Sequence, residues 1–163
     1  ASVKSEVISS PLKGERVELQ NVNDEMFAKG ILGDGVAIIP SEGKLYSPAD
    51  GEVTTAFQTG HAVGITTENG AEILMHIGIN TVELKGKYFD LKVKQGQKVK
   101  SGDLLVEFDA ERIKSDGYDI TTPVVITNSK LYKVNTNLNS KFVNPGEELI
   151  LLERKENADV KKS

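Results

Sequence analysis

Two histidines, His61 and His76, are the side chains of this sequence whose ordinary pKa lies closest to neutral pH. The chain has no cysteine, which excludes disulfides, thiolate metal ligands and cysteine nucleophiles. A neutral imidazole is able to attack an electrophilic phosphorus atom while a second imidazole donates an N–H to the developing charge. Thr59, two residues before His61, offers a hydroxyl that is able to orient the second ring or to bond the phosphoryl group. This set of residues is able to carry phosphoryl chemistry on histidine.

Metal binding is the alternative use of the same pair. Zinc takes four ligands, so His61 and His76 alone make an incomplete site. A third ligand has to come from Glu72, from Asp34 or from a partner protein. We therefore expect no intrinsic metal site, and leave open a zinc ion held by His61 and His76 at a partner interface.

A β-hairpin is the element that brings the two histidines together. Asn69-Gly70 is a strong hairpin turn signal. Antiparallel pairing about it joins residues 62–67 to residues from Ala71 onward, which puts His61 and His76 near one another at the open end.

Period-two alternation predicts how the second strand of this hairpin faces. The expected core face consists of Ile73, Met75, Ile77 and Ile79. The opposite face consists of Leu74, His76 and Gly78. Small residues at Gly60, Gly64 and Gly78 allow a ligand or another protein to come close. An apolar collar that excludes water and docks a partner is expected from Phe27, Phe57, Val63 and Leu74.

The rest of the chain predicts an all-β fold, an antiparallel β-sandwich or barrel with only short helical turns. Short apolar runs alternate with Gly, Pro, Asp and Asn turns. Candidate strands are residues 6–8, 16–19, 36–39, 44–47, 51–57, 62–67, 72–77, 104–108, 122–127, 131–135 and 148–153. Helical turns are expected at residues 24–29, capped by Asp24, and at residues 110–115.

Two sequence patterns recur and suggest a duplicated β-motif. Ser-Pro-x-x-Gly-Glu occurs at Ser10 and again at Ser47. Val-x-x-Gly-x-x-Leu occurs at Val99 and again at Val143, with the second leucine at the matching position. Ordinary turn sequences also produce such repeated patterns by chance, so duplication and chance both remain open.

Composition limits the class of partner. The chain has 163 residues, 20 basic and 24 acidic side chains and a net charge of −4. This balance, without a Lys/Arg cluster, argues against nucleic acid as a partner. The length predicts one domain at residues 6–154, between an N-terminal arm or linker at 1–5 and a charged tail at 155–163.

Several longer motifs resemble the glucose-type enzyme IIA family of the bacterial phosphoenolpyruvate-dependent sugar phosphotransferase system. They are Thr59-Gly60-His61-Ala62, the block at residues 72–86 and the block at 122–128. Supporting matches lie at residues 27–38 and 96–103. The resemblance spans about residues 6–154, and the block ending in Leu84-Lys85-Gly86 is the most specific part. Among subgroups, the chain looks more like the IIA domains of multidomain β-glucoside or sucrose-type permeases.

The resemblance implies a phosphotransferase that works through a phosphohistidine. His76 would accept the phosphoryl group from the phosphocarrier protein HPr and pass it to a cysteine of the IIB domain of a sugar permease. His61 matches the second histidine, which hydrogen-bonds the phosphate, and Thr59 matches the hydroxyl beside it. Phe27 and Phe57 match positions in the hydrophobic depression around the site. Because this chain has no cysteine, the accepting thiol belongs to another domain.

The sequence departs from the family pattern at three partner-binding positions. Asn80 stands where the family commonly has Asp, which removes a carboxylate from the docking surface. Val63 and Leu74 replace aromatic residues of the rim, which is expected to shift partner preference.

The resemblance also implies the setting. The mechanism needs no cofactor, and the chain is expected in the cytoplasm, or at the cytoplasmic face of the membrane as part of a fused permease. A monomer is favoured over an oligomer. Two other classes stay open: a non-catalytic module whose histidine pair holds zinc at a regulatory interface, and a lipoyl- or biotinyl-type carrier. The second needs a lysine at a hairpin tip, and Asn69-Gly70 has none.

Overall fold

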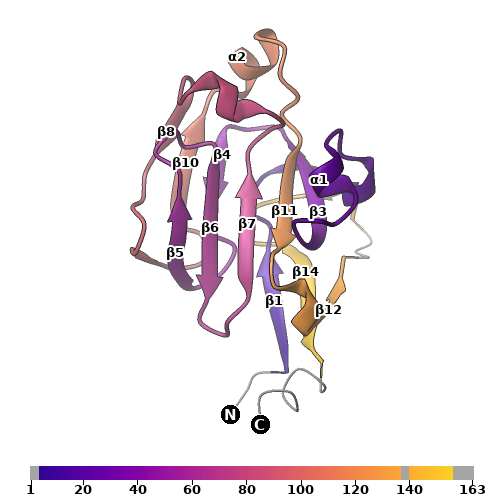
Figure 1. Cartoon of the computed structure of the whole chain (residues 1–163). Coiled ribbons are helices and arrows are strands. Elements are labelled where there is room, and N and C mark those ends of the chain that lie inside the picture. The colour runs from indigo at the N-terminus through magenta and orange to yellow at the C-terminus, as the bar shows by residue number, and fades with distance from the viewer. Residues whose placement is uncertain (1–3, 137–139, 156–163) are drawn as a thin grey trace.

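A computed structural model describes residues 4–136 and 140–155 of the chain (Figure 1). Strand β1 (Ser5–Ser9) begins inside the predicted N-terminal arm, one residue before the expected start of the domain. Most of that arm, and the predicted tail beyond Lys155, lie outside the described residues. In the part of the chain that is described, no helix has the length and apolar character needed to cross a membrane.

The described strands form three antiparallel sheets, and the predicted β-sandwich is confirmed. The eight-stranded sheet has the order β13 (Phe142–Val143), β2 (Gly14–Glu18), β3 (Asp34–Pro40), β11 (Thr122–Ile126), β7 (Glu72–His76), β6 (Ala62–Thr67), β5 (Gly51–Ala56), β9 (Lys98–Val99). One three-stranded sheet has the order β1, β14 (Glu148–Arg154), β12 (Tyr132–Asn135). The other has the order β4 (Lys44–Tyr46), β10 (Leu104–Phe108), β8 (Phe89–Leu91).

The helices are short, as predicted. Helix α1 (Glu25–Ala28) is capped by Asp24, whose Oδ1 accepts a hydrogen bond from the Met26 N–H at 2.9 Å. Helix α2 (Ala110–Ser115) is capped by the Asp109 carboxylate in the same way. Three single turns of 3₁₀ helix complete the described helical structure: η1 (Leu19–Asn21), η2 (Thr81–Leu84) and η3 (Ser129–Leu131).

Each predicted strand is present, with ends within two residues of the expected ones. Strands β8, β9 and β13 were not predicted. They contain two or three residues each, so they are too short to show an alternating apolar pattern. They form because a neighbouring strand offers unpaired backbone groups, which is a long-range effect.

Apolar side chains fill both faces of the eight-stranded sheet. The main core lies between this sheet and the two smaller ones and includes Ile73 and Met75 of β7. A smaller cluster on the opposite face includes Phe27 and Ala37, with Leu74 packed against it. Helix α1 covers part of this second face (Figure 1). The candidate site lies on this second face.

Equivalent hydrogen bonds support the duplicated motif. Ser10 Oγ donates to the carbonyl two residues ahead, and Ser47 Oγ does the same, at 2.7 and 2.8 Å. The Gly146 N–H donates to the Ser10 carbonyl, and the Gly102 N–H donates to the Ser47 carbonyl. The strands next to these turns also pair in the same way. Strand β2, which follows Ser10, pairs with β13, and strand β5, which follows Ser47, pairs with β9. Repeated contacts between distant segments are more than turn chemistry alone would produce.

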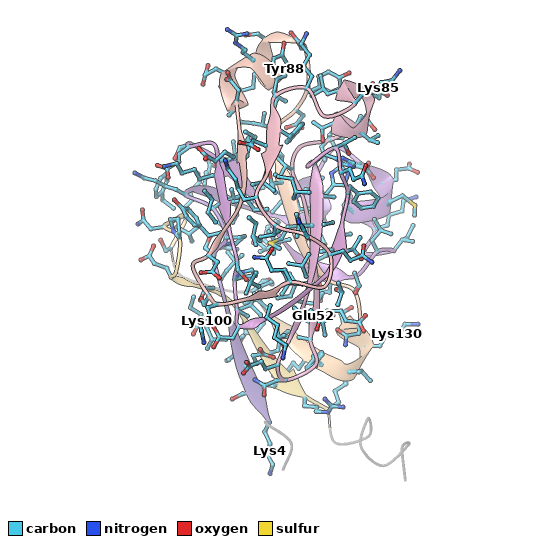
Figure 2. All side chains as sticks on the ribbon, turned by 90° about the vertical axis from the view of Figure 1, so that its left-hand side faces the viewer. Lys4, Glu52, Lys85, Tyr88, Lys100 and Lys130 are labelled. Atoms are coloured by element: carbon cyan, nitrogen blue, oxygen red, sulfur yellow. The ribbon has the colours of Figure 1, made fainter. Side chains whose placement is uncertain are left out.

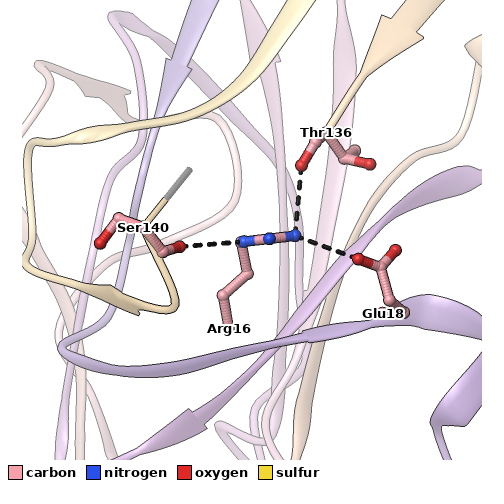
Figure 3. Close-up of polar contacts among 4 residues, drawn as sticks. All are labelled: Arg16, Glu18, Thr136 and Ser140. Carbon is pink, nitrogen blue, oxygen red and sulfur yellow. Dashed lines mark hydrogen bonds and ion pairs between the residues drawn. The ribbon is translucent and has the colours of Figure 1, made fainter. Parts of the chain in front are cut away.

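One arginine ties the end of β12 to the start of β13 (Figure 3). Arg16 Nη1 donates to the Thr136 carbonyl at 3.2 Å and to Glu18 Oε1 at 3.4 Å. Its Nε donates to the Ser140 carbonyl at 3.3 Å. The Arg16 side chain is only 12% exposed. Its contacts therefore hold these two segments against the edge of the large sheet.

Four lysines show how the molecule presents basic side chains on different parts of its surface. The labelled lysines Lys4, Lys85, Lys100 and Lys130 lie at separate places around the molecule (Figure 2).

Candidate functional site

The β6–β7 hairpin brings His61 and His76 together, as the Asn69-Gly70 turn predicts. Ala62 pairs with His76 across the two strands, and the Ile77 N–H donates to the His61 carbonyl at 2.7 Å. The centroids of the two imidazole rings lie 5.2 Å apart, with the ring planes at 75°. Backbone pairing between the two strands is therefore enough to place the two histidines side by side.

His76 is held with one ring nitrogen engaged and the other available. Its Nδ1 lies 2.7 Å from the Gly78 carbonyl oxygen. A carbonyl oxygen only accepts hydrogen bonds, so Nδ1 has the hydrogen. In the neutral ring, Nε2 then keeps a lone pair and is the nucleophilic atom. The side chain is half-buried and lines an open groove.

His61 is held by Thr59. Its Nδ1 lies 2.7 Å from Thr59 Oγ1, and the histidine is 4% exposed. A hydroxyl either donates or accepts. When Thr59 donates, the His61 hydrogen lies on Nε2, and His61 becomes a hydrogen-bond donor to a ligand in the groove.

Burial keeps both rings neutral. Desolvation lowers the pKa of His61 to about 4, with a smaller contribution from the neighbouring His76. Desolvation also lowers the pKa of His76, although the Gly78 carbonyl and the Asp24 carboxylate oppose that shift. At neutral pH both imidazoles are therefore uncharged, so one is able to act as a nucleophile and the other as a hydrogen-bond donor.

The lowered pKa of His61 predicts a pH dependence of stability. The unfolded chain takes up a proton on this residue near its ordinary pKa of 6.5, but the folded chain does so only near 4. The free energy of unfolding therefore decreases as pH falls from about 6.5 towards 4. The contribution of His61 to this decrease reaches about 3 kcal/mol. Urea unfolding across this range should show a steeper loss for the wild type than for His61→Gln, which removes the titrating ring. Parallel curves for the two proteins would contradict the assignment.

The groove around the histidines has a volume of about 800 Å³ and a mostly apolar lining. The Phe27 ring lies 5.5 Å from His76, and the Phe57 ring lies 5.1 Å from His61. Leu74 also lines the groove. Three of the four predicted collar residues are therefore at the groove. Phe27 is buried, while Phe57 is 47% exposed and forms part of the rim.

Two expectations about facing are wrong. Val63 pairs with Met75 and is fully buried in the main core, so it does not belong to the collar. Ile79 lies in the smaller cluster, not on the core face with Met75. The reason is the same in both cases, because the alternation stops at the open end of the hairpin. Strand β6 begins only after His61, and β7 ends at His76 before a left-handed turn at Gly78 (φ 76°).

Small residues form the floor of the groove. Ala62 and Gly64 of β6 both line it. A Cβ at Gly64 would lie 3.3 Å from the Thr55 side chain, so a larger residue would crowd the floor. Asn80, the predicted docking position, is exposed in a left-handed conformation at the start of η2 and is not among the residues lining the groove.

Sequence reasoning missed three groups at the site. Asp24 caps α1 and also lines the groove near His76. The Gly78 carbonyl fixes the hydrogen on His76. Val82, 54% exposed, adds an apolar rim residue. Val82 lies in the block at residues 72–86 that is most typical of the family, which is the signal that points to it.

The donor set does not complete an intrinsic metal site. Within residues 4–136 and 140–155, no group of three or more His, Cys, Asp or Glu side chains is placed to hold a metal ion. Glu72 accepts a hydrogen bond from Thr127, and Asp34 accepts one from the Gly35 N–H. His61 and His76 provide two nitrogen ligands, which fit zinc only if a partner provides the rest.

Comparison with protein families matches residues 6–132 to the family described as phosphoenolpyruvate-dependent sugar phosphotransferase system, EIIA 1. The chain belongs to this family. The resemblance found from the motifs is therefore confirmed, and the EIIA match includes both histidines, the block at 72–86 and the block at 122–128.

Curated EIIA relatives include both fused and separate proteins. The PTS system beta-glucoside-specific EIIBCA component of Halalkalibacterium halodurans is 50% identical over 151 residues, which are 93% of this chain and 24% of that protein. The PTS system glucose-specific EIIA component of the same organism is 48% identical over 128 residues, 78% of this chain and 74% of that protein. This chain thus spans about a quarter of the length of its beta-glucoside-specific relative.

A solved EIIA structure has the same fold. Glucose permease IIA from Mycoplasma capricolum superposes with a TM-score of 0.82 at 35% sequence identity. The superposition covers 91% of this chain and 96% of that one. The three-sheet arrangement described above is therefore the EIIA fold, a β-sandwich.

Proposed function

We propose that this EIIA chain is a phosphoryl carrier that works through His76. In this proposal, His76 accepts a phosphoryl group from phospho-HPr and passes it to a cysteine of the IIB domain of a sugar permease. The observation that carries the proposal is the hydrogen bond from His76 Nδ1 to the Gly78 carbonyl, at the edge of an open groove. It leaves Nε2 as an unprotonated nucleophile.

The chemistry balances without a cofactor. The Nε2 lone pair of His76 attacks phosphorus, a new N–P bond forms, and the N–P bond of the donor phosphohistidine breaks. In the second step a thiolate of IIB attacks the same phosphorus. The N–P bond of phospho-His76 breaks, and Nε2 regains its lone pair. Such transfers pass through loose transition states, so positioning and charge stabilisation are the main tasks of the protein.

His61 serves as the charge-stabilising donor in this proposal. Its ring centroid lies 5.2 Å from that of His76, which is close enough for a phosphoryl group on His76 to reach an N–H of His61. The His61 ring is neutral at pH 7, so its N–H donates without adding a charge that would trap the phosphoryl group. Burial makes the bond stronger than it would be in water.

The surroundings of the groove suit protein partners. Met26, Phe57 and Val82 are large apolar residues that line the groove and have 47%, 47% and 54% of their surface exposed. Exposed apolar residues at the edge of a concave site are typical of docking surfaces. Asp24 adds a carboxylate that favours a basic group on the partner. The EIIBCA names of relatives support IIB as the acceptor. The proposal places the chain in the cytoplasm, where HPr would reach it, alone or beside a permease.

Thr59 provides a test of the His61 role. Thr59→Val keeps the shape but removes the hydroxyl that bonds His61 Nδ1 at 2.7 Å. We expect onward transfer to IIB to slow about tenfold, because one hydrogen bond that fixes the His61 tautomer is lost. Thr59→Ser keeps the hydroxyl and should transfer at close to the wild-type rate. Rapid-quench measurement of transfer from the phosphorylated chain to IIB separates the two; equal rates for both variants would disprove a role of this hydroxyl.

Reconstitution of the relay tests the proposed function itself. The chain is incubated with phosphoenolpyruvate, enzyme I and HPr, and acid-labile phosphate on the chain is measured. Label that depends on HPr and is discharged by IIB supports the carrier role. A chain that takes no label from phospho-HPr, while a known EIIA protein in the same mixture does, would show that the proposal is wrong.

A further inference from the structure

The Gly78 carbonyl has a defined position because its turn is enclosed on two sides. Gly78 has a φ of 76°, a conformation that side chains rarely allow. A Cβ at this position would lie 2.6 Å from Thr81 Cγ2 and 2.9 Å from the Asp119 carbonyl oxygen. The methyl group of Thr81 and the backbone at Asp119 therefore leave the Gly78 turn little freedom to move.

Thr81 also closes the turn through its hydroxyl. The side chain is fully buried, and Oγ1 donates to the Ile77 carbonyl at 2.5 Å. The Ile77 N–H in turn donates to the His61 carbonyl, and the Ile79 N–H donates to the Asp119 carbonyl, at 2.7 and 2.8 Å. The residues on both sides of Gly78, Ile77 and Ile79, are thus each fixed by a backbone hydrogen bond to another segment.

We propose that Thr81 is a positioning residue for phosphoryl transfer. Its hydroxyl, through the Ile77 carbonyl, holds the Gly78 carbonyl where it keeps the hydrogen of His76 on Nδ1, which leaves Nε2 as the attacking atom. Thr81 lines no part of the groove and acts on the reaction only through Gly78 and His76. The inference rests on the proposed role of His76.

Removal of the hydroxyl has a defined consequence. In Thr81→Val the Ile77 carbonyl loses its donor inside the protein, and a buried acceptor without a donor is unfavourable. The turn at residues 77–81 relaxes, and the Gly78 carbonyl moves out of line with Nδ1. The His76 ring then populates both tautomers, and one of them has its hydrogen on the atom that must attack.

The experiment uses the full chain with Thr81→Val and, as the matched control, Thr81→Ser, which keeps the hydroxyl. Nitrogen NMR of the unphosphorylated proteins reports the tautomer of His76, and rapid-quench assays with phospho-HPr report the rate of acceptance. We expect Thr81→Val to show mixed tautomers and about tenfold slower acceptance. Thr81→Ser should keep the wild-type tautomer and rate. A wild-type tautomer in Thr81→Val, or equal damage in both variants, would overturn the proposal.

Two features keep the result clear. If Thr81→Val does not fold, the wild-type protein still provides a test, because the buried Thr81 hydroxyl proton should be visible by NMR and protected from exchange with water; rapid exchange would overturn the proposal. The tautomer measurement also needs no phosphoryl transfer. Suppose that the wild-type chain never accepts the phosphoryl group, but that the His76 tautomer differs between the wild type and Thr81→Val. This result would refute the carrier function and would still support the control of His76 by Thr81.

Discussion

His76→Gln is expected to abolish phosphoryl acceptance, with a loss of about 10³-fold or more, because an amide has no lone pair able to form the N–P bond. Glutamine is similar in length to histidine and still offers an N–H to the Gly78 carbonyl, which Nδ1 contacts at 2.7 Å. The fold should therefore survive. Acid-labile label after incubation with phosphoenolpyruvate, enzyme I and HPr measures the effect.

The control for this variant is its own stability. Urea unfolding at pH 7.5 should place His76→Gln close to the wild type, because at this pH both folded and unfolded states hold a neutral ring. A folded His76→Gln protein that takes label at the normal rate would mean that another residue accepts the phosphoryl group.

His61→Gln is expected to separate the two steps of the relay. Acceptance from phospho-HPr should stay within about threefold of the wild type, while transfer to IIB should slow about 100-fold. The difference has a physical cause. In the first step the nucleophile is the neutral His76 ring, but in the second step it is a thiolate that approaches an anionic phosphoryl group. The N–H of His61 offsets that repulsion from a rigid ring that Thr59 holds close to His76. A glutamine amide also has an N–H, but its flexible chain does not hold the donor at the position of the imidazole nitrogen.

The two steps are measured separately, first with phospho-HPr alone and then with the isolated phosphorylated variant and IIB. Phe57→Leu is a matched control, since it changes the neighbour of His61 at the rim and leaves the His61 ring in place. Its discharge to IIB should remain much faster than that of His61→Gln. Unimpaired discharge by His61→Gln would disprove the assigned role.

The hairpin that forms the site could be predicted because its signals are local. The Asn69-Gly70 turn and the alternation from Ile73 to Met75 are visible in the sequence, and they fix which strands pair. The β-sandwich was predictable for the same reason, since short apolar runs and turns repeat along the whole chain.

The prediction for Val63 was wrong because the face of a residue depends on where its strand begins. Directly paired residues of an antiparallel hairpin share a face, so Ala62 lies on the His76 side and Val63 lies on the Met75 side. Counting by twos from His61 gives the opposite answer. His61 precedes β6 and follows a left-handed Gly60 (φ 77°), so it is outside the alternation. The strand boundary, which sequence patterns locate poorly, decided the face.

Other parts of the site depend on contacts between distant segments. Asp24 reaches the groove because α1 packs on the outer face of the sheet, and the turn at Gly78 is fixed by Asp119 from beyond α2. The sequence identifies Asp24 as a helix cap, but nothing local indicates that it faces His76. The tautomer of His76 likewise depends on a backbone carbonyl, which no residue type reveals.

The position of the phosphoryl group on the ring tests the central claim most directly. The chain, labelled with nitrogen-15 in histidine, is phosphorylated through HPr and examined by nitrogen and phosphorus NMR. Because Nδ1 of His76 is engaged by the Gly78 carbonyl at 2.7 Å, we predict phosphorus bonded to Nε2 of His76, with the hydrogen still on Nδ1. Phosphorus on Nδ1, or on any atom of His61, would contradict the account.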